Sequence, residues 1–61
     1  MDFNKDAKEL CLGLTLKEIK ELFESDFDPL SKQIYYFGAY YQLLVDEGLD
    51  GEYFVADLFA I

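Results

Sequence analysis

Cys11 is the single cysteine of this 61-residue chain, which has no histidine, and both facts limit how the chain can hold a fold. One cysteine excludes an intramolecular disulfide, and one cysteine without histidine excludes a zinc site built from those residues. A chain this short buries only about 60% of the surface that its unfolded state exposes, so a small hydrophobic core must stabilise it. We therefore predict a single acidic helical domain spanning residues 1–61, suited to a reducing cytoplasm.

Acidic residues dominate the charge: thirteen Asp and Glu oppose five Lys, which gives a net charge of −8. All five lysines lie at or before Lys32, whereas residues 33–61 carry five carboxylates and no basic residue. Such a surface should repel phosphate backbones and anionic membranes, so we expect no direct binding to nucleic acid or membrane. The natural partner is a basic surface of a larger protein. The alternative is that acidity only keeps an aromatic-rich small protein soluble.

The first half of the chain carries the signals of two short helices, which we place at about residues 3–12 and 15–25. Asp2 or Asn4 is a candidate cap for the first helix, and Gly13 is placed where a left-handed residue would end it. Thr15 and Glu18 have the spacing of a capping box. Apolar residues then recur at helical spacing, at Leu16, Ile19, Leu22 and Phe23.

A proline marks the start of the second half, because Asp28 is a preferred cap and Pro29 suits a first helical position. Apolar residues follow at spacings of 4, 3, 4 and 3, at Leu30, Ile34, Phe37, Tyr41 and Leu44, and Gly48 comes after them. This pattern predicts a long central helix over about residues 29–47. We expect a last helix over 51–60, although its Tyr-Phe-Val segment also has strand propensity. The predicted fold is all-α, a bundle of three to four helices around the central one.

The predicted central helix has a second stripe, formed by Tyr36, Tyr40 and Leu43. Either the other helices bury both stripes, or the Tyr36/Tyr40 face, or Phe54 and Leu58, stays exposed as a contact site. Tyrosine suits such a site because it offers a large rigid contact area with a polar tip. The residues predicted to bind a partner are this tyrosine pair with the acidic segment that follows it: Tyr36, Tyr40, Asp46, Glu47, Asp50, Glu52, Tyr53 and Asp57.

In size, charge and composition the chain resembles the nucleic-acid mimics and inhibitors made by phages and mobile elements, including anti-CRISPR proteins. The resemblance implies an inhibitor that blocks a basic groove on a larger nucleic-acid-handling protein, in the host cytoplasm if the chain is phage-encoded. A second hypothesis is a self-associating structural or adaptor protein, with the Tyr36/Tyr40 face forming a symmetric homodimer.

A third hypothesis is a degenerate calcium-binding loop of the EF-hand type at residues 46–57. Asp46, Asp50, Gly51 and Asp57 fit positions one, five, six and twelve of such a loop. Gly48 and Phe54 occupy ligand positions three and nine, so the fit is partial. We therefore predict a plain turn between helices and no metal site, with Asp46, Asp50 and Asp57 as weak candidates.

Catalysis is not expected. Without histidine or arginine, and with one cysteine on a predicted core face, neither a nucleophile with its base nor a phosphate clamp is available. We predict no cofactor and no enzyme activity.

Overall fold

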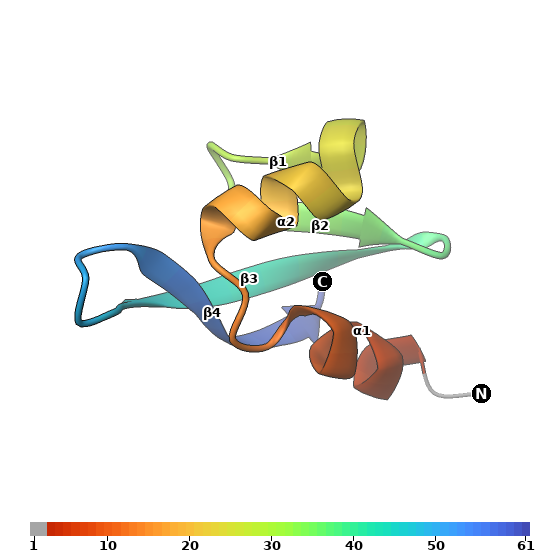
Figure 1. Ribbon diagram of the computed structural model, residues 1–61. Helices are drawn as coiled ribbons and strands as arrows, with labels where there is room; N and C mark the ends of the chain where they lie inside the picture. Colours follow the sequence, from red (N-terminus) through yellow and green to blue (C-terminus); the bar gives the residue numbers. More distant parts are fainter. Residues whose placement is uncertain (1–2) are drawn as a thin grey trace.

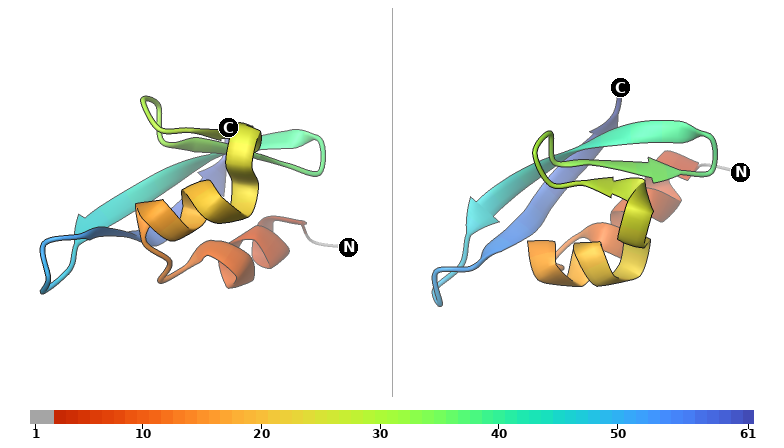
Figure 2. Two further views of the ribbon diagram at one scale, coloured as in Figure 1. Left: turned by 45° about the horizontal axis from the view of Figure 1, so that its top comes forward. Right: turned by 90° about the horizontal axis from the view of Figure 1, so that it is seen from above.

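The computed structural model describes residues 3–61, which form two helices and a four-stranded antiparallel sheet (Figure 1). The helices are α1 (Phe3–Cys11) and α2 (Leu16–Phe23), followed by the 3-10 turn η1 (Glu24–Asp26). The strands β1 (Phe27–Asp28), β2 (Gln33–Tyr36), β3 (Ala39–Glu47) and β4 (Tyr53–Ala60) pair in chain order. Both helices lie on the same side of the sheet (Figure 2). The prediction of an all-α bundle is therefore wrong.

The two short helices are confirmed, because their signals are local. The Thr15 hydroxyl accepts a hydrogen bond from the Glu18 N–H at 3.2 Å, and Glu18 Oε1 accepts one from the Thr15 N–H at 3.1 Å. Gly13 has φ +85° just after α1, as the predicted stop requires. The helix already begins at Phe3, so Asn4 is not its cap. The other candidate cap, Asp2, lies outside the described residues.

Residues 33–47 form the β2–β3 hairpin, and residues 29–32 form the turn before it, so the predicted central helix over 29–47 is wrong. Phe37 and Gly38 are the two central residues of its turn, with φ +46° and +86°. Positive φ at both positions is typical of the type I′ turn, whose twist matches that of paired strands. On each side the chain carries Tyr and other residues with high strand propensity. Asp28 caps the preceding turn, accepting hydrogen bonds from the N–H groups of Leu30 and Ser31 at 3.0 and 3.4 Å.

Residues 53–60 form β4, so the predicted last helix is also wrong. The strand pairs with β3 along its length, with a register shift at Leu44/Val45 that leaves Ala56 without a partner on β3. This bulge places the two buried residues of β4, Val55 and Leu58, three positions apart on one face. Buried residues three positions apart match the periodicity of a helix, so the sequence pattern does not indicate a strand here.

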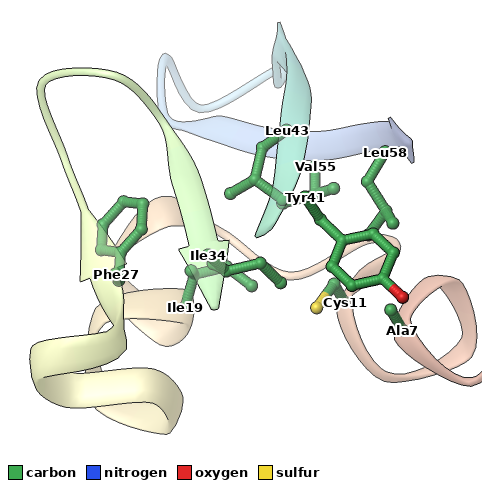
Figure 3. Close-up of a cluster of buried hydrophobic side chains, with 9 residues drawn as sticks. All are labelled: Ala7, Cys11, Ile19, Phe27, Ile34, Tyr41, Leu43, Val55 and Leu58. Atoms are coloured by element: carbon green, nitrogen blue, oxygen red, sulfur yellow. The ribbon is translucent and has the colours of Figure 1, made fainter. Parts of the chain in front are cut away.

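The core lies between the helices and the inner face of the sheet (Figure 3). Both helices and all four strands contribute to it, through Ala7, Cys11, Ile19, Phe27, Ile34, Tyr41, Leu43, Val55 and Leu58. Cys11 is fully buried, as its predicted core position requires. Burial raises the pKa of its thiol to about 11, so the thiol is protonated at neutral pH. Neither described helix is long and apolar enough to cross a membrane.

Candidate partner-binding face

The face of the sheet opposite the helices is the candidate functional site, and we call it the outer face. Strand alternation and register place on it the side chains of Gln33, Tyr35, Tyr40, Gln42, Leu44, Asp57, Phe59 and Ile61. Their neighbours Ile34, Tyr41, Leu43 and Leu58 are the buried residues of the inner face. Both views in Figure 2 show the helices on the far side of the sheet from this face.

Aromatic and aliphatic side chains occupy the end of the outer face near the β2–β3 turn. Tyr35 and Tyr40 are opposite each other in the strand pair, with ring centroids 5.0 Å apart in a T-shaped arrangement. Ile61 is next to Tyr40, because its N–H donates to the Tyr40 carbonyl at 3.0 Å. Tyr40 is 58% exposed and Ile61 is 70% exposed. This end therefore presents an unprotected apolar patch to the surroundings.

A hydrogen-bonded pair of glutamines crosses the middle of the outer face. Gln42 donates through Nε2 to the carbonyls of Ser31 and Lys32 at 2.8 and 3.1 Å. Its Oε1 accepts from Gln33 Nε2 at 3.1 Å. These hydrogen bonds fix the orientation of both side-chain amides. They do not use Gln33 Oε1, which can accept a hydrogen bond from another group. Phe59 lies on the other side of Gln42, as its partner in β4.

The acidic residues of the second half gather at the far end, around the turn between β3 and β4. Asp46 and Glu47 end β3, while Asp50 and Glu52 belong to the turn, and all four are exposed. The turn is closed by hydrogen bonds from Gly48 N–H to Glu52 O at 2.8 Å and from Glu52 N–H to Asp50 Oδ1 at 3.1 Å. It projects beyond the helices (Figure 1). The structure thus brings these four predicted site residues together.

The four other predicted site residues lie apart from that cluster. Tyr40 is on the outer face, whereas Tyr36 is on the inner face, where its ring meets that of Phe23 edge-on at 6.3 Å. The predicted Tyr36/Tyr40 contact face therefore does not form, and neither does a dimer interface built on it. Asp57 lies in β4 opposite Leu44 and forms an ion pair with Lys8 at 3.6 Å. Tyr53 is half exposed at the start of β4.

The helix-loop-helix version of a calcium site is excluded by the fold, because residues 46–57 join two strands. Asp46 ends one strand and Asp57 lies within the next. Among residues 3–61, no group of three or more His, Cys, Asp or Glu side chains is placed to hold a metal ion.

Backbone hydrogen bonds already occupy part of the free edge of β4. Gly13 N–H donates to the Val55 carbonyl at 2.9 Å, and Val55 N–H donates to the Leu14 carbonyl at 2.8 Å. Further along the strand, Leu58 N–H donates to Asp57 Oδ1 at 2.8 Å. A further strand would need these groups, so the edge is a poor place for strand addition. The face of the sheet is the larger open surface.

Sequence reasoning missed Tyr35, Gln33, Gln42 and Phe59. The signal that could have found the first three is strand alternation across Gly38. Ile34 and Tyr36 alternate with Gln33 and Tyr35 before the glycine, and Tyr41 and Leu43 alternate with Tyr40 and Gln42 after it. Two such runs flanking a glycine-containing pair are the mark of a hairpin.

Comparison of the chain with protein-family models, curated proteins and solved structures gave no match. The functional argument therefore depends on the shape, charge and exposure of the outer face.

Proposed function

We propose that this protein is a small acidic binding module whose outer face docks on a basic surface of a larger protein. The observation that carries the proposal is an open sheet face with exposed apolar side chains at one end and carboxylates at the other. Tyr40, Phe59 and Ile61 supply the apolar contact, and Asp46 and Glu47 lie at its far end. An apolar centre with a polar rim is the usual arrangement of a protein interface.

The distribution of charge supports a basic partner. The four strands carry four carboxylates, at Asp28, Asp46, Glu47 and Asp57, and no lysine. Four of the five lysines belong to α1 and α2, which cover the other face of the sheet. The negative potential therefore favours approach of a positively charged surface to the sheet side.

A basic groove that normally holds nucleic acid is the partner surface that we favour. Carboxylates on the projecting turn offer negative charge where a bound strand would place phosphates, while the outer face supplies apolar contact. We therefore propose an inhibitor or nucleic-acid mimic of the kind that phages and mobile elements make, including anti-CRISPR proteins. We place it in the cytoplasm, or in the host cytoplasm if it is phage-encoded, where its one thiol would stay reduced.

The test begins with affinity capture from the native host, or from a phage-infected one, to identify the bound protein. The affinity of the purified pair is then measured at increasing salt, with the wild type and a variant carrying D46N, E47Q, D50N and E52Q. The asparagines keep the side-chain oxygens that accept hydrogen bonds in the turn. We expect steep weakening with salt and a large loss of affinity in the variant, because both remove charge attraction.

The matched control neutralises four carboxylates on the helix side, at Asp6, Glu9, Glu21 and Glu24. It changes the net charge by the same amount away from the outer face. If both variants lose affinity equally, total charge matters rather than the outer face. If neither variant nor salt alters binding, the charge-driven proposal is wrong.

A further inference from the structure

A hollow of about 370 Å³ lies where η1 and β1 meet the outer face. Its wall combines aromatic, acidic and polar side chains, including Ser25, Asp26, Asp28, Gln33, Tyr35 and Tyr40. Three separate segments build it: the 3-10 turn with β1, the strand β2, and the start of β3. The hollow is therefore a feature of the tertiary fold rather than of one loop.

The aromatic wall offers ring surface to an occupant. Tyr35 and Tyr40 are held against each other by their strand pairing, with centroids 5.0 Å apart, and both are exposed. The face of a tyrosine ring carries negative potential, which attracts a cation placed over it. A flat cation gains most because it also stacks on the ring.

The polar wall consists mainly of hydrogen-bond acceptors. The Asp28 carboxyl is kept charged by hydrogen bonds from Ser31 and Leu30, which lower its pKa from the ordinary value. Asp26 adds a second carboxylate. Gln33 Nε2 is committed to Gln42, so its Oε1 is the amide atom left for an occupant. None of the described residues that line the hollow is a lysine.

Acceptors beside aromatic rings select a donor-rich, planar cation. The guanidinium of arginine has five N–H donors in one plane, pairs with carboxylates through two parallel hydrogen bonds, and stacks on aromatic faces. The ammonium of lysine is a compact, strongly hydrated charge that gains less from stacking.

We infer that the hollow receives an arginine side chain of the basic partner protein. This inference rests on the proposed function, since the arginine belongs to the partner. It adds a specific anchor: one of the two rings, Tyr35 or Tyr40, stacks on the guanidinium and the other borders it. Asp26 and Asp28 neutralise its charge, and Gln33 Oε1 accepts one of its N–H groups.

The experiment needs no partner protein. A blocked Gly-Arg-Gly peptide is titrated into the ¹³C,¹⁵N-labelled protein at constant ionic strength, and nuclear magnetic resonance follows the Tyr35 and Tyr40 rings and the Gln33 amide. Peptides with lysine or with citrulline, the uncharged isostere of arginine, serve as comparisons. We expect saturable shifts with arginine in the millimolar range, weaker binding of lysine, and no binding of citrulline.

The D26N/D28N variant should bind the arginine peptide roughly tenfold more weakly, because it loses two charge contacts. Asn at position 28 keeps the side-chain oxygen that accepts the hydrogen bonds of the turn, so the hollow should keep its shape. The matched control E9Q/E21Q removes the same charge from the helices and should bind like the wild type.

Three results would overturn the inference: no saturable shift at these residues, equal binding of lysine or citrulline, or equal weakening by both variants. One of these results can be found while the affinity of the captured complex still falls with salt and with neutralisation of the acidic turn. In that case only the arginine inference is wrong, and the proposed function stands. Arginine binding without any such complex would refute the proposed function instead.

Discussion

Replacing Gly38 by alanine should destabilise the protein, because Gly38 has φ +86° in the turn between β2 and β3. Glycine adopts this conformation without strain, whereas the Cβ of an L-residue meets the following carbonyl oxygen. Beyond residues 37 and 39, no described atom lies within 4 Å of the position that a Cβ would take at residue 38. The whole cost therefore comes from the local backbone and not from a clash with a neighbouring element.

The expected loss in the free energy of unfolding is about 1 to 2 kcal/mol, the usual cost of the left-handed conformation for an L-residue. In a domain of this size such a loss lowers the melting temperature by about 4 to 8 °C for each kcal/mol. The direction of the change in the free energy of unfolding distinguishes a hairpin from a helix. Inside a helix, the same Gly-to-Ala substitution would raise the free energy of unfolding by about 1 kcal/mol.

Urea unfolding followed by circular dichroism measures both the wild type and Gly38→Ala. The control carries D-alanine at position 38, which chemical synthesis can install in a chain this short. D-alanine favours positive φ, so this control should be at least as stable as the wild type. A higher urea midpoint for the L-alanine variant than for the wild type would refute the hairpin.

Three further substitutions or conditions have defined outcomes. Thr15→Ala should lower the free energy of unfolding by about 1 kcal/mol in urea titrations, because it removes the side-chain cap of α2. Glu24→Gly should raise the free energy of unfolding by about 1 kcal/mol, because Glu24 has φ 53° and ψ −117°, a strained conformation that glycine tolerates. A lower free energy of unfolding in this variant would contradict that geometry. The Cys11 thiol should react with Ellman's reagent at pH 8 only as fast as the protein opens. Because its pKa rises from 9.0 to about 11 on folding, the stability due to the buried neutral thiol should be present below pH 9 and decline between pH 9 and 11. Fast reaction of the folded protein at pH 8 would show that the thiol is accessible.

The part of the fold that the sequence could predict is the part determined by neighbouring residues. The capping box of Thr15 and Glu18 and the stop at Gly13 act within a few positions, and α1 and α2 form where they indicate. The rest depends on pairing between distant segments.

The β2–β3 hairpin was misread because two periodicities share residues. Ile34 and Tyr41 are buried and fit either a helical stripe or alternating strands. Leu30 and Phe37 fit only the helix, and they are 92% and 70% exposed. Gly38, costly inside a helix and favourable in a tight turn, was the residue that distinguished the two.

The candidate site was recovered in part for the same reason. Asp46, Glu47, Asp50 and Glu52 are close in sequence, so they cluster whether a turn joins helices or strands. Tyr36 and Tyr40 are four positions apart, which makes them neighbours on a helix, but a two-residue turn puts them on opposite faces of a sheet. Tyr35 is the true neighbour of Tyr40 because register, not spacing, joins them.

The most direct test of the central claim compares two variants in binding to the captured partner. One carries Tyr40→Thr and Phe59→Thr on the outer face, where threonine suits a strand. The other carries Leu10→Gln and Leu22→Gln, which are similarly exposed on the helices. With both variants shown to be folded, we predict that the helix variant binds like the wild type and the outer-face variant does not. Undiminished binding by the outer-face variant would contradict the proposal that this face is the docking surface.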